Sequence, residues 1–323
     1  MPRTTAPRLR WGILGTGGIN DRFLRHAREA RAEFVAVGSR TRERAEAFAA
    51  QHRIPRAHGS YDDLLSDPLV EAVYICLPNS LHHPWTLRAI AAGKHVLCEK
   101  PYSRRAAEVV EAYDAADSAR VRLMEGFMWR HTPQARRFTE LLPEIGELRT
   151  IRATFSFVLT DRSDIRVNAS LDGGSLMDVG TYCVSGARLV AGAEPELVHG
   201  EQLLGPSGVD IQFTGMLRFP GGVVATIASG FNTEHATLEA IGTGGSIFLR
   251  GPWFGDTPTI SVNGRDVAVE SADPYRLELD NFAAAVRGDE PQLLGRADAL
   301  GQARTIEALY RAAAAGEAVK VAS

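Results

Sequence analysis

The first 126 residues alternate short apolar runs with helix-like segments, and this alternation constrains the fold more than any other feature of the sequence. The apolar runs are Leu9–Leu14, Phe34–Gly38, Ala72–Leu77, His95–Cys98 and Arg122–Met124. The helical patterns between them are Asn20–Ala30, Thr41–His52, Leu81–Ala92 and Ala106–Ala119. Short continuous apolar runs are typical of parallel strands that are buried on both faces. Their alternation with helices therefore predicts a doubly wound parallel sheet over residues 1–126.

After Phe127 the pattern changes to strands that follow one another directly. A helix is expected at Thr132–Leu142, a strand at Arg149–Leu159 and a second helix at Ser175–Val190. Glycine-rich turns then separate the strand candidates Leu197–Leu204, Ile211–Arg218, Val223–Phe231, Thr237–Ile241 and Ser246–Leu249, and two helices follow at Tyr275–Arg287 and Arg296–Ala315. Successive hairpins form antiparallel sheet. Residues 127–323 are therefore predicted to form an α+β domain with a large, mostly antiparallel open sheet, whose uncovered face predicts a homodimer or homotetramer.

A glycine-rich turn lies between the first strand and the first helix. It reads Gly15-Thr16-Gly17-Gly18-Ile19, with Asn20 in the place of the third glycine of the full dinucleotide fingerprint. Glycines at this junction let the backbone turn tightly and let a pyrophosphate approach the N–H groups at the helix start. The turn therefore predicts a Rossmann-type dinucleotide site that includes these five residues.

The choice between NADP and NAD depends on the end of the second strand. Ser39 and Arg40 stand there, and no carboxylate occurs before Glu43. An acidic residue at this place binds the ribose 2′-hydroxyl and repels a 2′-phosphate, whereas serine and arginine bind phosphate oxygens. We therefore expect NADP as the cofactor, with NAD as the second choice.

The fifth predicted strand ends abruptly in Glu99-Lys100-Pro101. Lysine is rare in this chain, since only three of its 36 basic residues are lysines. Ligands of open α/β sheets bind outside the carboxyl ends of the strands, which places Lys100 where a substrate meets the cofactor. Glu99 is the nearest acidic partner in the sequence, although neighbouring residues of a strand point to opposite faces. The alternative is that Lys100 is an ordinary surface residue.

Composition narrows the possible partners and compartment. The 323 residues carry a net charge of −3, with 45% hydrophobic and 23% charged residues, and no basic stripe stands out. These values are typical of a globular protein and argue against nucleic acid or a membrane as a partner. Cys76, Cys98 and Cys183 are widely separated, which predicts buried thiols in a reducing compartment. No metal site is expected, and the cytoplasm is the expected location.

Several of these motifs together resemble the Gfo/Idh/MocA family of oxidoreductases. They are the glycine turn, Pro78-Asn79 after the fourth strand, Glu99–Pro101, Glu125–Arg130 and Gly173–Tyr182. The resemblance implies hydride transfer between NAD(P) and a sugar or related cyclic polyol. Many members have histidine where this chain has Tyr182, and the pattern Asp178-Val-Gly-Thr-Tyr182 is similar to that of glucose–fructose oxidoreductase, dimeric dihydrodiol dehydrogenase and xylose dehydrogenases.

The resemblance also implies roles for three residues. Tyr182 is expected to act as the acid/base, with Lys100 orienting the substrate oxygen and Asp178 positioning Lys100 or a substrate hydroxyl. We also expect the Lys100 ammonium to lower the pKa of Tyr182, because a nearby positive charge favours tyrosinate. Two alternative functions fit the same scaffold. One is a dinucleotide-dependent regulator without catalysis, and the other is an enzyme that recycles a tightly held cofactor.

A last group of residues has weaker support. Pro78, Asn79 and His82 follow the fourth strand and are expected to border the cofactor, as is Glu99. Trp129 and Arg130 are expected either to form a sugar-facing wall or to pack between the domains. Arg166 precedes the second-domain helix and is expected to bind a substrate hydroxyl or to be structural.

Overall fold

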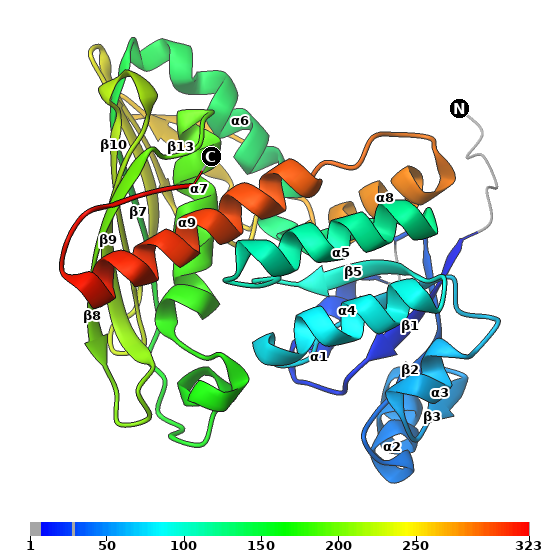
Figure 1. Cartoon of the computed structure of the whole chain (residues 1–323). Coiled ribbons are helices and arrows are strands. Elements are labelled where there is room, and N and C mark those ends of the chain that lie inside the picture. Colours follow the sequence, from blue (N-terminus) through cyan, green and yellow to red (C-terminus); the bar gives the residue numbers. More distant parts are fainter. Residues whose placement is uncertain (1–7, 28–29, 323) are drawn as a thin grey trace, which may run out of the picture.

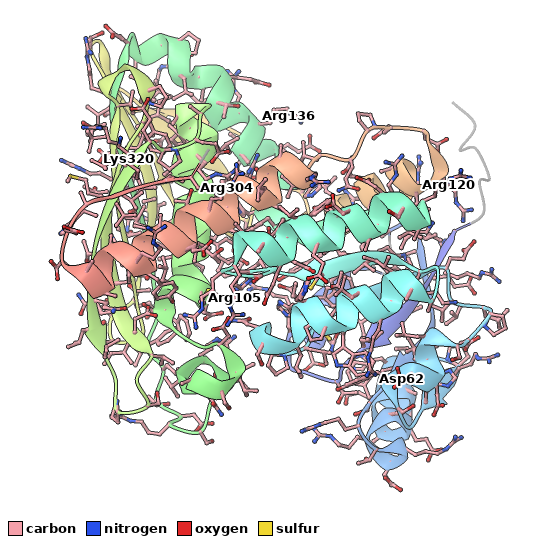
Figure 2. All side chains as sticks on the ribbon, in the orientation of Figure 1. Asp62, Arg105, Arg120, Arg136, Arg304 and Lys320 are labelled. Carbon is pink, nitrogen blue, oxygen red and sulfur yellow. The ribbon has the colours of Figure 1, made fainter. Side chains whose placement is uncertain are left out.

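The computed structural model describes residues 8–27 and 30–322, which form two sheets with their own helices (Figure 1). The predicted helix Asn20–Ala30 extends into residues 28–29, which lie outside this described part. Among the described residues, no helix combines the length and the apolar character needed to cross a membrane. Charged side chains are spread over both halves of the surface (Figure 2).

The first sheet has six parallel strands in the order β3-β2-β1-β4-β5-β6. The strands are β1 (Leu9–Leu14), β2 (Ala32–Gly38), β3 (Arg56–His58), β4 (Ala72–Ile75), β5 (His95–Glu99) and β6 (Leu123–Gly126). This is the order of a doubly wound dinucleotide-binding sheet, and the predicted fold is confirmed. The order reverses between β1 and β4, so the segments that follow these two strands face a common crevice.

Five helices accompany this sheet, namely α1 (Ile19–Ala27), α2 (Arg42–His52), α3 (Tyr61–Leu65), α4 (His82–Ala91) and α5 (Ala106–Ala119). Local capping explains where two of them begin. The side chain of Thr41 accepts a hydrogen bond from the Arg44 N–H at the start of α2, and Ser60 accepts one from Asp63 at the start of α3. Such caps satisfy N–H groups that have no partner within the helix.

The second sheet has nine strands in the order β14-β13-β12-β11-β7-β10-β9-β8-β15. The strands are β7 (Leu148–Ser156), β8 (Leu197–Leu204), β9 (Asp210–Arg218), β10 (Val224–Gly230), β11 (His235–Gly242), β12 (Gly245–Arg250), β13 (Thr259–Val262), β14 (Arg265–Ala268) and β15 (Val319–Lys320). Among the described strands of this sheet, only the β7–β10 pair is parallel, so the predicted, mostly antiparallel sheet is confirmed.

Helices α6 (Pro133–Leu141), α7 (Thr181–Ala191) and α9 (Arg296–Ala315) accompany the second sheet, and all three contact its strands (Figure 1). The side chains of β9 alternate between buried and exposed, as expected for a strand with one covered face. Leu203 and Met216 are exposed apolar residues of β8 and β9.

The last two helices connect the halves of the molecule. Helix α8 (Pro274–Arg287) packs on α1 and β2, and α9 packs on both α5 and β8 (Figure 1). The rings of Trp11 and Phe282 lie 5.2 Å apart and are fully buried. The C-terminal segment therefore completes the core of the dinucleotide-binding half, although it follows the second sheet in the sequence.

Candidate active site

The glycine turn after β1 has the geometry of a phosphate-binding loop. Gly15 has a φ of 107°, and a Cβ placed there would lie 2.9 Å from Leu77. A Cβ on Gly18 would meet nothing within 4 Å, so the backbone is open to a ligand at that point. The buried amide of Asn20 donates to the carbonyl oxygens of Gly15 at 3.3 Å and Gly17 at 2.9 Å. This residue therefore braces the turn from the position where the fingerprint has a glycine.

A cavity of about 520 Å³ opens beside this turn. Its wall includes Gly17, Gly18, Ile19, Pro78, Asn79, His82, Glu99, Lys100 and Asp178. Backbone N–H groups at the start of α1 and a roomy cavity at the reversal of strand order suit the pyrophosphate of a dinucleotide. The residues present therefore fit a nicotinamide dinucleotide, which supplies or accepts the hydride when it is bound.

Ser39 and Arg40 follow β2, next to the glycine turn. The Ser39 hydroxyl is buried and lies 3.4 Å from that of Thr16, whereas Arg40 is exposed. Neither residue lines the 520 Å³ cavity. Their place at the carboxyl end of β2 is the one at which Rossmann domains contact the adenosine ribose.

Lys100 lies in an ionic cluster at the end of β5. Its Nζ donates to the backbone oxygen of Asp178 at 2.7 Å and lies 3.3 Å from Asp178 Oδ1, while Arg166 Nε donates to Oδ2 at 2.8 Å. Only 13% of the Lys100 side chain and 15% of the Asp178 side chain are exposed. Burial opposes ionisation of Asp178, but the two cations outweigh it and lower its pKa. The carboxylate thus stays ionised and holds both cations.

A π-helical turn, Leu176–Gly180, carries Asp178 and runs directly into α7. Such turns break the regular hydrogen-bond pattern of an α-helix and occur often at functional sites. Here the carbonyl oxygen of Asp178 accepts its hydrogen bond from Lys100. The backbone and the side chain of one residue therefore anchor the same ammonium group.

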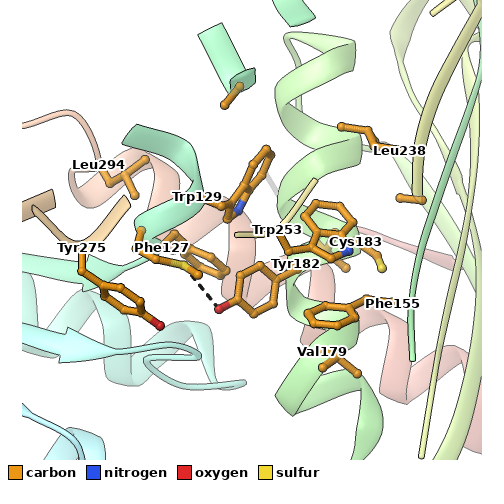
Figure 3. Packing of buried hydrophobic residues seen from close by; sticks show 14 of the residues in the cluster. Phe127, Trp129, Phe155, Val179, Tyr182, Cys183, Leu238, Trp253, Tyr275 and Leu294 are labelled. Carbon is orange, nitrogen blue, oxygen red and sulfur yellow. Dashed lines mark hydrogen bonds between the residues drawn. The ribbon is translucent and has the colours of Figure 1, made fainter. Parts of the chain in front are cut away.

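The ring of Tyr182 meets this cluster, but its hydroxyl does not. Lys100 Nζ lies 4.9 Å from the ring centroid. The phenolic hydroxyl of Tyr182 donates to Met128 Sδ at 3.6 Å (dashed line in Figure 3). Burial raises the pKa of Tyr182 well above its ordinary value. The prediction that Lys100 lowers this pKa is therefore wrong for this structure, because burial and then the neighbouring acidic groups, Tyr275 and Glu99 first among them, raise it. The ammonium itself lies over the ring.

A second cavity of about 520 Å³ shares a wall with the first. Five residues line both cavities, namely Ile19, Glu99, Lys100, Arg166 and Asp178. The second cavity is otherwise lined by Arg22, Phe155, Ser156, Phe157, Val179, Tyr182, Glu234, His235, Ala236, Arg250, Gly251, Phe254 and Tyr275. A small molecule in this cavity and a dinucleotide in the other would therefore meet at Lys100.

Glu99 does not form the ion pair with Lys100 that its place in the sequence suggests. Its carboxylate accepts a hydrogen bond from the Tyr74 hydroxyl at 2.6 Å and another from the backbone N–H of Lys100 at 3.2 Å. Burial raises the pKa of Glu99, although Lys100 opposes this effect. The charge partner of the Lys100 ammonium is Asp178 instead.

Three residues predicted to contact ligands have other partners. Both ring nitrogens of His82 lie 2.8 Å from backbone oxygens, those of Pro101 and Leu77, and burial lowers its pKa to about 4. Trp129 is buried and packs edge-on against Trp253 at 5.2 Å (Figure 3).

Arg130 pairs with Asp298 at 3.1 Å, and neither Trp129 nor Arg130 lines the two cavities that meet at Lys100. Neither residue therefore forms a wall of these cavities, and packing, the alternative expectation, accounts for their contacts. The three cysteines are free and buried, as predicted.

Tyr275, at the start of α8, is a site residue that the sequence did not predict. Its side chain lines the second cavity and packs edge-on against Phe23 at 5.8 Å. The preceding Asp273 and Pro274 are a helix N-cap and first-turn residue, which predict a helix start but not a ligand contact. Tyr275 was not recognised because it comes to the site from a segment that follows the whole second sheet.

Comparison with known proteins identifies this architecture. Residues 9–127 match the Gfo/Idh/MocA oxidoreductase family with an NAD-binding Rossmann fold, and residues 143–248 match its C-terminal domain. D-xylose 1-dehydrogenase (NADP(+)) 2 of Haloferax volcanii is 38% identical, over 96% of this chain and 99% of that protein. The chain belongs to the Gfo/Idh/MocA family. The predicted family, nicotinamide dinucleotide and oxidoreductase class are thereby confirmed.

Other members agree with this assignment. Mouse trans-1,2-dihydrobenzene-1,2-diol dehydrogenase is 38% identical, over 79% of this chain and 78% of the relative. Among solved structures, the 3-ketoreductase KijD10 of Actinomadura kijaniata in complex with NADP and TDP-benzene has a TM-score of 0.88 and 29% identity, over 94% of this chain and 98% of that one. This Gfo/Idh/MocA member thus shares its fold over nearly its full length with a solved 3-ketoreductase.

Proposed function

We propose that the protein transfers a hydride between NADP and a carbinol or carbonyl carbon of a sugar or related cyclic polyol. The observation that carries the proposal is the wall shared by the two cavities, where Lys100 and Asp178 face both. The relatives named for D-xylose and dihydrodiol oxidation support the substrate class.

Lys100 orients the substrate oxygen. Its ammonium is fixed by Asp178 and stays close to the boundary between the cavities, so it donates to an oxygen on the reacting carbon. A compact ammonium suits one oxygen better than the planar fork of arginine does. Arg166, held by the same carboxylate and by Asp164, lines the boundary beside it and binds a neighbouring hydroxyl.

Tyr182 exchanges the proton. A phenol with a raised pKa holds its proton at neutral pH, so Tyr182 is in the protonated form that reduction of a carbonyl requires. Its bond to Met128 Sδ is weak, because a thioether is a poor acceptor, and the hydroxyl is free to turn toward a substrate oxygen. Oxidation of a carbinol runs the same transfer in reverse and requires that substrate and cofactor lower this pKa.

NADP is the preferred cofactor because Ser39 and Arg40 stand at the end of β2. A guanidinium and a hydroxyl bind a 2′-phosphate, which an acidic residue at this place would repel. The NADP named for the Haloferax relative and bound to KijD10 supports this choice. We also propose a cytoplasmic homodimer or homotetramer that covers the open face of the second sheet.

The test is an assay with NADP or NAD and a panel of aldoses, inositols and dihydrodiols, followed at the absorbance of the reduced nicotinamide. We expect turnover with at least one of them, preferentially with NADP. Lys100→Met and Tyr182→Phe should each lower kcat by orders of magnitude while cofactor affinity stays largely unchanged.

Near-normal turnover in either variant would remove that residue from the mechanism. Cofactor binding without turnover of any substrate would favour a dinucleotide-dependent regulator.

A further inference from the structure

The second cavity has a buried inner end and a charged mouth. Lys100, Tyr182 and Tyr275 lie at the inner end, where little side-chain surface is exposed. Four residues that line the same cavity are exposed, namely Arg22, Glu234, His235 and Arg250. The mouth therefore presents two guanidinium groups against one carboxylate.

Arg22 reaches the mouth from the dinucleotide-binding half. It stands one turn after Ile19 on α1, and its guanidinium carbon lies 4.1 Å from the centroid of the Phe254 ring. Stacking of this kind holds the planar group but leaves its N–H edges free to bind a ligand. No ion pair of Arg22 with a carboxylate occurs within the described residues.

Arg250 reaches the mouth from the second sheet. It ends β12 opposite Thr237 of β11, and the next N–H, that of Gly251, donates to Ala236 O at 2.9 Å. The backbone at the rim is thereby fixed by hydrogen bonds. Arg250, too, has no carboxylate partner in the part of the chain that the structure describes.

In the described part of the chain, carboxylates pair with the cations at the inner end, but not with those at the mouth. Asp178 pairs with both Lys100 and Arg166, and Asp164 pairs with Arg166 as well. Among the exposed residues that line the cavity within the described ranges, Glu234 is the only acidic one. An anion entering there gains two charge-assisted contacts without displacing an existing ion pair.

We propose that the substrate is an acidic sugar or polyol, whose carboxylate or phosphate binds Arg22 and Arg250 while its reacting carbon lies at Lys100. This inference rests on the proposed function, because it extends the same cavity outward. Arg22 and Arg250 come from different halves of the molecule, so an anion that bridges them also holds the two walls of the cavity together. A cavity of this size accommodates such a molecule, since small-molecule sites measure roughly 300–1,000 Å³.

The experiment compares a neutral hexose with the matching uronate and 6-phosphate, using NADP-loaded protein. We expect at least one anionic sugar to exceed the neutral sugar ten-fold or more in kcat/KM. Arg22→Gln and Arg250→Gln should each lower the anionic-to-neutral ratio of kcat/KM about ten-fold, mainly through KM, as expected for a lost charge-assisted contact. Arg22→Lys should recover part of the ratio. Arg25→Gln, on the same helix but outside the cavity, is the matched control and should leave the ratio unchanged.

The uronate and phosphate arms distinguish the two anions. Equal kcat/KM for neutral and anionic sugars, or a ratio that both variants leave unchanged, would overturn the proposal. Calorimetric titration of the same three sugars into the NADP-loaded protein separates it from the proposed hydride transfer. Tighter binding of an anionic sugar that depends on Arg22 and Arg250 but gives no turnover would refute the hydride transfer alone, whereas equal binding of all three would refute the anion site.

Discussion

Replacing Asp178 with asparagine tests the ionic cluster on which the proposed chemistry depends. The change keeps the size of the side chain and its backbone oxygen but removes the charge that faces Lys100 at 3.3 Å and Arg166 at 2.8 Å. Lys100 would keep one hydrogen bond to the backbone of residue 178 and lose its counter-ion. We therefore expect the variant to be less stable than the wild type and its Lys100 ammonium to be less well oriented.

The size of the effect follows from the burial of each pair. A hydrogen bond to a charged group contributes roughly 1.5–3 kcal/mol, which applies to the well-buried Lys100 pair. Arg166 is 39% exposed, so its pair contributes only about 0–1 kcal/mol after solvent screening. Since asparagine keeps part of these bonds, the free energy of unfolding should fall by about 2 kcal/mol. In a domain of about 150–250 residues each kcal/mol shifts Tm by roughly 2–4 °C, so we expect Tm to fall by roughly 4–8 °C.

The pH dependence gives a second measure of the same cluster. The pKa of Asp178 is lowered in the folded protein from its ordinary 3.8, so its contribution to stability is present above the unfolded value. It is lost as the pH falls through the folded value. The difference in stability between wild type and Asp178→Asn should therefore be constant above about pH 5 and shrink only in stronger acid.

Thermal unfolding over this pH range and steady-state kinetics with the best substrate check these expectations. We expect kcat of Asp178→Asn to fall about 100-fold or more, as is typical when an electrostatic catalytic group is misplaced. Asp164→Asn is the matched control, since it removes a partner of Arg166 without touching Lys100. Asp178 does not have this role if Asp178→Asn keeps its Tm and turnover, or if Asp164→Asn loses as much.

Three further predictions follow from other residues. Tyr275→Phe should raise KM roughly 3- to 10-fold, as expected for the loss of one neutral hydrogen bond, with cofactor affinity unchanged. The control is Tyr113→Phe, which removes a buried hydroxyl outside both cavities. Equal effects of the two changes would argue against substrate contact by Tyr275. Arg40→Asp should weaken NADP relative to NAD by roughly 10- to 100-fold in Kd, and an unmoved preference would exclude Arg40 from phosphate binding. Burial raises the pKa of Glu125 from 4.5 to about 8, so its contribution to stability is full below the unfolded value and lost as the pH rises. In urea unfolding, the wild type should lose up to about 5 kcal/mol of stability as the pH rises, whereas Glu125→Gln should not. Identical pH profiles of the two proteins would contradict the raised pKa of Glu125.

Much of the fold was predictable because its strands are short, apolar and regularly spaced. The bounds of β1 and α9 agree with those expected from the sequence. The strand β3 was missed because its three residues are polar or small and only partly buried, and the strands β13 to β15 are similarly short. Such short strands depend on pairing with their neighbours rather than on their own pattern.

The candidate site was predictable where one strand end or one loop carries the chemistry. The scarcity of lysine was informative, since both Lys94 and Lys100 donate to backbone carbonyl oxygens. The direction of the Tyr182 hydroxyl was not predictable, because it depends on Met128, which lies 54 positions earlier in the sequence. Arg22 and Tyr275 were missed for the same reason, since only the packing of α1 and α8 brings them to the cavity.

The packing of the last helices on the first sheet has a consequence for how the chain matures. Trp11 is covered by Phe282, and Phe23 by Tyr275, so these aromatic faces stay open to water until α8 has been synthesised. A fragment that stops at residue 126 would expose them and tend to aggregate. Any transplant of the nucleotide-binding unit into another protein must therefore include residues 274–287, even though nearly 150 residues separate them from the rest of that unit.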